Sequence, residues 1–151
     1  MRYISHRGNL IGPMPEHENK PAYILNALSL GFDCECDVWY HENDYWLGHD
    51  HPQYKISSQF LFTKGLWIHA KNYDAFTNIV SAFPDVNVFF HDSDPYTLTS
   101  QGFIWAYPGQ PIRPERTVCV MPERIPTEEK HLAYGICSDY IVREKLEAHM
   151  R

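Results

Sequence analysis

The sequence lacks any long run of apolar residues. No hydrophobic stretch approaches the roughly 20 residues that a helix needs to cross a bilayer. Residues 1 to 10, MRYISHRGNL, also lack the apolar core of a secretory signal peptide. We therefore expect a cytoplasmic protein with no membrane span.

A cluster of basic residues is also missing. The chain has 13 lysines and arginines against 19 acidic residues, for a net charge of -6, and the basic residues form no stripe. Binding to the backbone of a nucleic-acid duplex depends on such a stripe, so this class of partner is excluded. A phosphorylated substrate would have to be neutralised locally, by one arginine, one lysine or a metal ion.

The four cysteines, Cys34, Cys36, Cys119 and Cys137, lack the spacing of a disulfide scaffold. Without a signal peptide they are expected to be reduced thiols. Cys34 and Cys36 would share one face of a strand, but the two-residue gap of a zinc site is absent. Buried packing is therefore favoured over an all-cysteine zinc site.

The residues that are present predict one α/β domain spanning 1–151. A composition of 44% hydrophobic and 15% aromatic residues is enough for a packed core. Short apolar runs alternate with helical or loop segments. We expect strands at 2–5, 32–40, 66–70, 86–90, 103–107, 117–121 and 134–141, a hairpin at 41–50, and helices at 18–30, 74–83 (capped by Asp74) and 142–150.

This order of elements favours a parallel sheet closed into a trimmed (β/α) TIM-type barrel with short connections. Such barrels typically have about 250 residues, and connections such as 108–116 are too short for a full helix. We therefore expect a partner subunit, in a homo-oligomer, to cover the flanks that lack helices.

Most of the predicted strands end in polar or ionisable residues. These ends would share one rim of a parallel barrel, which is where such enzymes place their active sites. They are His6-Arg7, Glu35 and Asp37, His69 and Lys71, His91-Asp92, Glu123 and Ser138-Asp139.

The strand FDCECDVWY (32–40) carries three acids on one face. At the strand period of two, Cys34 and Cys36 fall on the side that packs under helices, whereas Glu35 and Asp37 point the other way. Two carboxylates on one face repel unless a positive charge neutralises them. Near the rim, these two could share a hard divalent cation.

With these residues placed, the chain resembles the glycerophosphodiester phosphodiesterase family, among the phosphatidylinositol-phospholipase-C-like phosphodiesterases. The resemblance is carried by His6-Arg7-Gly8, Glu18-Asn19, Gly31, Glu35-Cys36-Asp37 and His49-Asp50, which follow the family's order over the first 50 residues. Lys71 stands where the family has a lysine at a strand end, and Trp105 and Ser138-Asp139 loosely match later strand ends.

The resemblance implies a phosphoric diester hydrolase in which His6 and His49 form the acid–base pair of an in-line displacement at phosphorus. Imidazole suits both proton transfers because it titrates near neutral pH. Arg7 and Lys71 would bind the phosphate oxygens, and Trp105 would contact the substrate. The substrate would be a small-molecule or glycan-linked phosphodiester.

The resemblance also implies that Glu35 and Asp37 hold a divalent metal ion, Mg or Ca. The family usually has a third acid two positions before the lysine, where this chain has His69. An imidazole ligand would shift the preference towards Mn or another transition ion. His69 could instead be a substrate or wall contact.

Two other functions remain open from the sequence. One is a barrel that binds a phosphorylated ligand without cleaving it. The other is a cyclic-nucleotide or oligonucleotide phosphodiesterase, in which aromatic side chains near the rim would stack on a base. The same aromatic side chains would equally suit a sugar, or packing within the wall.

Overall fold

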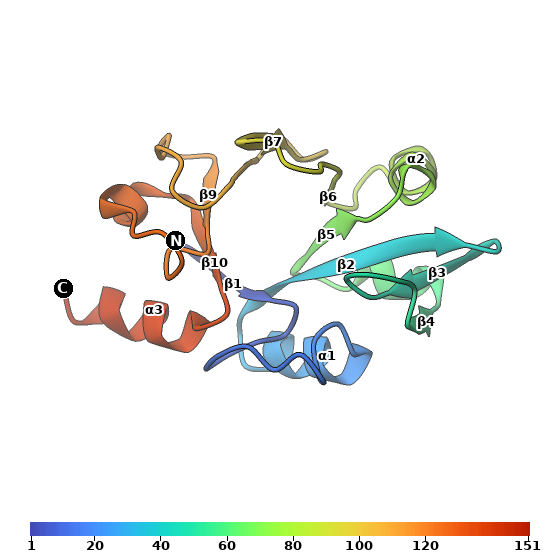
Figure 1. Ribbon diagram of the computed structural model, residues 1–151, viewed down its shortest axis with the longest axis horizontal. Coiled ribbons are helices and arrows are strands. Elements are labelled where there is room, and N and C mark those ends of the chain that lie inside the picture. Colours follow the sequence, from blue (N-terminus) through green and yellow to red (C-terminus); the bar gives the residue numbers. More distant parts are fainter.

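A computed structural model describes all of residues 1–151 as a ten-stranded mixed sheet that curls into a half-barrel, with three short α-helices outside it (Figure 1). The strands are β1 (Arg2–His6), β2 (Asp33–His41), β3 (Asp44–Leu47), β4 (Tyr54–Ile56), β5 (Leu66–Ala70), β6 (Val88–Phe89), β7 (Tyr96–Leu98), β8 (Ile104–Ala106), β9 (Thr117–Val120) and β10 (Gly135–Ser138). The helices are α1 (Pro21–Ser29), α2 (Tyr73–Ala82) and α3 (Ile141–His149), with short 3₁₀ turns η1 (Ser58–Phe62) and η2 (Glu128–Leu132).

The strands β6, β5, β2, β1, β10, β9 and β8 lie side by side in that order and run parallel. The first and last strands of the chain, β1 and β10, are therefore neighbours near the middle of the sheet. Antiparallel strands extend it: the hairpin β3–β4 pairs with the far half of β2, and β7 pairs with β8. All the parallel strands present their carboxyl ends at one edge, which positions the candidate site.

The predicted (β/α) TIM-type barrel is wrong. A barrel of that type alternates a helix with every strand, whereas this chain has only three helices and several antiparallel strands. The sheet also does not close by strand pairing, because β6 pairs with β5 alone. A single backbone hydrogen bond, from Ser100 N to Val88 O at 2.8 Å, links β6 to the segment beyond β7.

Proline explains the missing helices. Between β6 and β10 the connections contain Pro95, Pro108, Pro111, Pro114, Pro122 and Pro126. Proline lacks the backbone N–H of a helix interior and clashes with the preceding turn, so these segments run as loops. Only the β1–β2 and β5–β6 connections contain an α-helix, and α3 follows β10.

The core has two sides. On the outer side, Cys34, Cys36 and Val38 of β2 pack with Ile24 of α1 and Ile79 of α2. Packing of Cys34 and Cys36 under helices was expected from the sequence, and all four cysteines are free and buried. The inner side, beneath the candidate site, contains Ile4, Trp67, Phe89, Trp105, Val118, Val120, Met121 and Cys137.

Local signals set several boundaries. The predicted hairpin after residue 40 is present, and Glu42 and Asn43 form its turn with positive φ angles of 51° and 65°. The cap of α2 was predicted wrongly: Asn72, not Asp74, accepts the hydrogen bond from Ala75 N at 3.1 Å. The helices of the structure are all too short or too polar to be candidates for a membrane-spanning segment.

Candidate active site

Strand register brings the predicted site residues together. His6 at the end of β1 lies opposite Glu35 of β2, and Asp37 lies opposite His69 of β5. Side chains of paired residues in neighbouring strands project from the same face of a sheet. One imidazole and one carboxylate therefore stand at each of two successive levels on the inner face.

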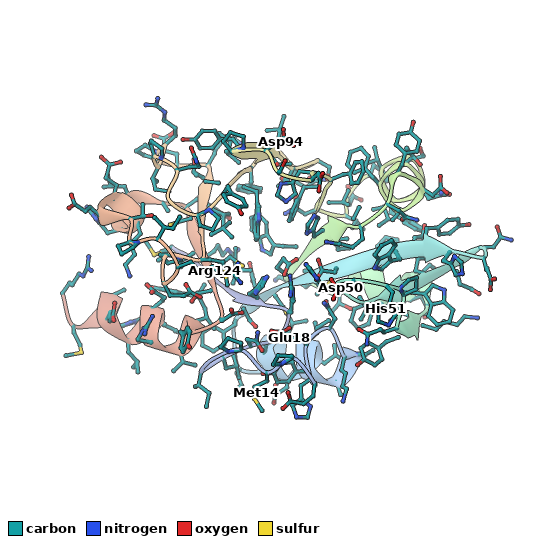
Figure 2. The ribbon with its side chains drawn as sticks, in the orientation of Figure 1. Met14, Glu18, Asp50, His51, Asp94 and Arg124 are labelled. Carbon is teal, nitrogen blue, oxygen red and sulfur yellow. The ribbon has the colours of Figure 1, made fainter.

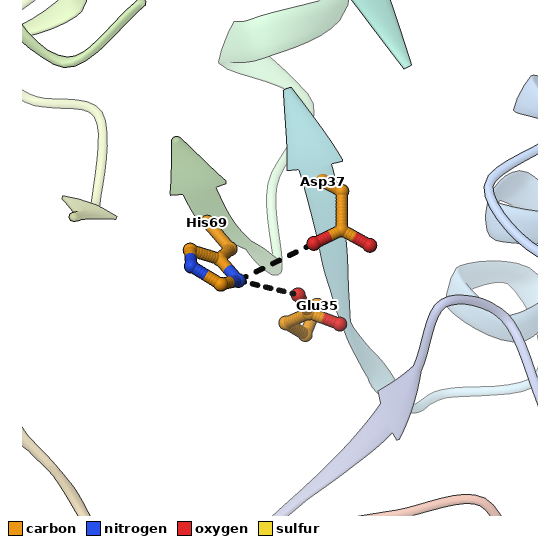
Figure 3. Close-up of side chains that lie close together, drawn as sticks. All are labelled: Glu35, Asp37 and His69. Atoms are coloured by element: carbon orange, nitrogen blue, oxygen red, sulfur yellow. Dashed lines mark ion pairs between the residues drawn. The ribbon is translucent and has the colours of Figure 1, made fainter. Parts of the chain in front are cut away.

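Glu35, Asp37 and His69 form a tight cluster (Figure 3). His69 Nδ1 lies 3.3 Å from Asp37 Oδ1 and 3.9 Å from Glu35 Oε1. One potential ligand atom from each residue lies within 4.8 Å of those of the other two. Both carboxylates are almost fully buried, with exposed fractions of 2% for Glu35 and 0% for Asp37.

The cluster has unsatisfied oxygens. Glu35 Oε2 and Asp37 Oδ1 are buried without a hydrogen-bond donor. Buried polar atoms of this kind are rare, and an ion is one of the partners that can satisfy them. Two carboxylates and an imidazole are also an established type of ligand set for divalent metals. These residues therefore fit a divalent cation.

Positive side chains already surround Asp37. Arg7 Nε lies 3.0 Å from Asp37 Oδ2, and Lys71 Nζ lies 3.8 Å from Asp37 Oδ1. Burial by itself would raise the pKa of Asp37, but its contact with His69 and the charge of Arg7 lower the pKa below its ordinary value. For Glu35, burial and the charge of Asp37 outweigh the nearby cations and raise the pKa. Asp37 is thus the more firmly ionised of the two.

Unusual backbone angles position the residues around Asp37. Arg7 and Asn19 have backbone φ angles of 56° and 63°, in the left-handed region that residues other than glycine rarely adopt. Asn19 donates to Asp37 Oδ2 at 2.8 Å and accepts from Asp37 N at 2.9 Å. Such strain persists only where the surroundings impose it, and it is concentrated at functional sites.

His6 is held by residues from the other end of the chain. Its Nδ1 lies 2.7 Å from Asp139 Oδ1, just beyond β10, and its Nε2 lies 3.8 Å from Glu35 Oε2. Asn9 Nδ2 also donates to Asp139 Oδ1, at 2.9 Å. Burial would lower the pKa of His6, but the contact with Asp139 and the charge of Glu35 outweigh it, so the pKa is raised. The sequence placed Asp139 at a strand end but gave it no role.

Seven of the eight side chains to which the sequence gave a role line one cavity of about 320 Å³. Of the predicted site residues, only Asp37 does not line it; Asp37 is fully buried and contacts His69 and Arg7, which do line it. Figure 2 shows Asp50 and Arg124 on opposite sides of the centre of the molecule. The cavity is lined by His6, Arg7, Glu35, His49, His69, Lys71, His91, Asp92, Trp105, Tyr107, Pro108, Val120, Met121 and Arg124.

His49 and Trp105 occupy different parts of the cavity. The half-exposed His49 belongs to the loop after β3, and its Nδ1 lies 2.7 Å from Asp50 Oδ1. Trp105 is only 5% exposed and stacks on Phe89, with ring centroids 4.7 Å apart. Trp105 therefore forms part of the cavity floor, and its contact with substrate stays a prediction.

Sequence reasoning gave no role to His91, which also lines the cavity. Its ring lies beside that of His69, with centroids 4.8 Å apart, and its Nδ1 is buried without a partner. Burial and the charge of His69 lower the pKa of His91 to about 4, so at neutral pH it is an uncharged imidazole. Its position just after β6, at the shared edge of the sheet, was the only signal in the sequence.

Comparison with known proteins identifies no relative. No family model matches the chain, and neither a curated protein nor a solved structure matches it. The function must therefore be argued from the site.

Proposed function

We propose that this chain is a metal-dependent phosphodiester hydrolase, of the kind suggested by its resemblance to the glycerophosphodiester phosphodiesterases. The observation that supports this most is that two histidines, two cationic side chains and a candidate metal cluster lie in and around one cavity. The histidines are His6 and His49, the cations are Arg7 and Lys71, and the cluster is Glu35, Asp37 and His69. These are the groups that in-line displacement at phosphorus requires: an acid, a base and a concentrated positive charge.

In this proposal, His6 and His49 move the protons. One imidazole accepts the proton of the attacking hydroxyl or water, and the other donates a proton to the oxygen of the leaving alcohol. Each has a carboxylate at its Nδ1, Asp139 for His6 and Asp50 for His49, both at 2.7 Å. A carboxylate at Nδ1 favours the tautomer protonated there and leaves Nε2 for the substrate.

Arg7 and Lys71 bind the non-bridging phosphate oxygens. Arg7 engages Asp37 through Nε at 3.0 Å, and its Nη1 lies 3.7 Å from Glu18 Oε2. The Nη2 end of its planar fork remains for the phosphate. Glu35, Asp37 and His69 would hold a divalent ion. When bound, the ion supplies positive charge that stabilises the additional negative charge on the phosphoryl oxygens.

The test is turnover of a phosphodiester panel, comprising glycerophospho-alcohols, a cyclic nucleotide and a chromogenic diester, each assayed with and without Mg²⁺, Mn²⁺ and Ca²⁺. Loss of general acid–base catalysis costs about 100- to 10,000-fold. His6→Ala and His49→Ala should each lower kcat within that range while keeping the wild-type circular dichroism spectrum. His17→Ala serves as the control, since His17 lies outside the cavity.

The outcomes separate this proposal from its alternatives. Near-normal activity in either folded histidine variant would reject the acid–base assignment. Binding of diesters without any turnover would favour a protein that only binds phosphorylated ligands. Turnover confined to cyclic nucleotides would favour the nucleotide phosphodiesterase.

A further inference from the structure

A second cavity lies on the β2–β3 hairpin. We name it the hairpin groove; it has a volume of about 470 Å³. It shares no lining residue with the cavity of about 320 Å³ that contains His6 and His49, which we call the catalytic cavity. The groove is lined by Trp39, His41, Glu42, Trp46, His51, Pro52 and Asn72.

The hairpin groove lies on the same face of β2 as Glu35 and Asp37. Alternate residues of a strand share a face, so Trp39 and His41 project from the same side as Glu35 and Asp37. At ~3.3 Å per residue, Trp39 lies only about 7 Å along the strand from Asp37. A substrate with its phosphate bound by Arg7 and Lys71 in the cavity that contains His6 and His49 would reach the groove by extending along β2.

Two segments line both cavities. The loop after β3 contributes His49 to the catalytic cavity and His51 to the hairpin groove. The segment after β5 does the same with Lys71 and Asn72. Trp39 Nε1 also donates to Gly48 O at 2.7 Å, next to His49. An occupant of the groove would therefore contact the loop that carries a proposed catalytic histidine.

The two tryptophans form an apolar platform. Trp39 lies directly opposite Trp46 in the antiparallel pairing, so both side chains project from one face of the hairpin, and both line the groove. Both indole N–H groups are already used, by Gly48 O at 2.7 Å and by His41 O at 3.3 Å. What the indoles offer an occupant is therefore their ring faces.

The rim of the groove is polar. His41 and Glu42 line the groove with His41 Nε2 3.7 Å from Glu42 Oε1, and His51 of the loop after β3 also lines it. A carboxylate accepts hydrogen bonds from hydroxyl groups, and an imidazole can donate or accept. The charge of Glu42 disfavours a second phosphate in the groove.

This combination suits a sugar ring. A pyranose has an apolar C–H face that can lie flat on an aromatic surface, and hydroxyl groups around its edge that need hydrogen-bond partners. A quaternary ammonium ion is best bound by several aromatic walls around it, whereas Trp39 and Trp46 are the only Trp, Tyr or Phe residues that line the groove.

We propose that the hairpin groove is a substrate subsite that binds a sugar ring carried by one alcohol of the phosphodiester. This inference rests on the proposed phosphodiesterase function and adds the class of substrate. The reacting phosphate would occupy the catalytic cavity while the sugar stacks on Trp39 and Trp46.

The experiment compares four p-nitrophenyl phosphodiesters that differ only in the second alcohol: glucose joined through its 6-hydroxyl, ethanol, choline and thymidine joined through its 5′-hydroxyl. Aromatic contacts contribute about 0.5–1.5 kcal/mol, or up to about tenfold. The ratio of kcat/KM for the glucose diester to that for the ethyl diester should therefore be about two to ten in wild type.

Trp46→Ala should reduce this ratio to near one, and Trp46→Phe should retain part of it. Trp46 is the cleaner probe, because Trp39 also holds the loop that carries His49. Tyr73→Ala is the control, since Tyr73 is 69% exposed and lines neither cavity. Calorimetric binding of the product glucose 6-phosphate gives a second readout, which should weaken in parallel with the ratio.

Wild-type protein that cleaves none of the diesters would overturn the proposed function and this inference with it. Equal kcat/KM for the glucose and ethyl diesters would overturn the subsite alone. A glucose preference that survives in folded Trp46→Ala would overturn the role of the groove. A preference for choline or thymidine that Trp46→Ala abolishes would overturn the sugar as occupant.

Discussion

At the scale of single residues, the contact between His6 and Asp139 joins the two ends of the chain. Asp139 follows β10, which pairs with β1, so the carboxylate meets His6 across neighbouring strand ends. Burial would lower the pKa of His6, but Asp139 and Glu35 raise it, while His6 and Asn9 lower that of Asp139 against its burial. The pair therefore favours an imidazole that is protonated at higher pH than usual.

Asp139→Asn tests this coupling. Removing the negative charge should lower the pKa of His6, because burial then acts with less opposition. The limb of the pH–kcat/KM profile that reports His6 should move to lower pH, whether His6 acts as the acid or as the base. Asp85→Asn, at an exposed carboxylate away from the cavity, is the control. An unmoved limb in active, folded Asp139→Asn would contradict the coupling.

His69 stands where the proposed relationship to the glycerophosphodiester phosphodiesterases would place a third acid. With Glu35 and Asp37 it gives a ligand set of two carboxylates and one imidazole. Nitrogen ligands suit Mn, Co and Zn better than Ca, whereas oxygen ligands alone suit Mg or Ca. His69 therefore should shift metal preference towards the transition ions.

His69→Glu should restore a preference for Mg²⁺ or Ca²⁺. The measurement is a parallel titration of wild type and His69→Glu with Mg²⁺, Ca²⁺, Mn²⁺, Co²⁺ and Zn²⁺, following both turnover and calorimetric binding. If His69 contacts only the substrate or the wall, the variant should lose activity while the order of metals stays the same. That result would reject His69 as a ligand.

At the scale of elements, the loop after β3 is positioned by backbone contacts around Gly48. Gly48 N donates to Asp37 O at 3.1 Å, and Trp39 Nε1 donates to Gly48 O. The φ angle of Gly48 is 152°, and a Cβ atom at this position would lie 2.1 Å from His51 O. The loop that presents His49 thus has room only for glycine.

Gly48→Ala should move this loop and lower kcat by at least about tenfold, because a displacement of about 1 Å can cost about 100-fold. Gly31→Ala is a matched control: its φ of 84° is also positive, but its added Cβ would meet nothing within 4 Å. The control should lose about 1–2 kcal/mol of stability from backbone strain alone and keep its activity. Equal kcat for Gly48→Ala and wild type would show that the loop tolerates the shift.

Several elements could be predicted from local sequence signals. The strand 66–70 was predicted with its correct bounds, and the face of β2 that carries Glu35 and Asp37 followed from the period of two. Asn72 was missed as the cap of α2, since Asp74 is an equally good capping residue by type. The short strands β4 and β7 were missed, because three residues carry too little periodicity to be recognised.

At the scale of the whole molecule, the meeting of the strand ends at one edge could be predicted from the sequence. Whether the sheet closes into a barrel or stays open could not. Parallel strands place their carboxyl ends together in an open, curled sheet as well as in a barrel, so His6, Glu35 and His69 still meet. The barrel failed because the number of apolar runs does not reveal which strands pair. The prolines between β6 and β10 already argued against a helical layer there. Partners of Asp139 and His91 depend on contacts between distant segments, which no local pattern encodes.

The proposed hydrolysis requires a divalent metal held by Glu35, Asp37 and His69. Asp37 is the sharpest position to test, because it is fully buried and in contact with His69, Arg7 and Lys71. Asp37→Asn keeps the shape of the side chain and removes the charge that holds a hard cation.

The most direct measurement is turnover of a chromogenic phosphodiester by wild type and Asp37→Asn, before chelation, in excess chelator and after return of Mg²⁺ or Mn²⁺, with bound metal measured in the same samples. Wild type should lose turnover and metal together and regain both. Asp37→Asn should bind little metal and stay at least about 100-fold less active throughout. Even mutation of residues that only support metal ligands lowers metal affinity or activity by about 10- to 100-fold. Full wild-type activity in excess chelator would contradict the account.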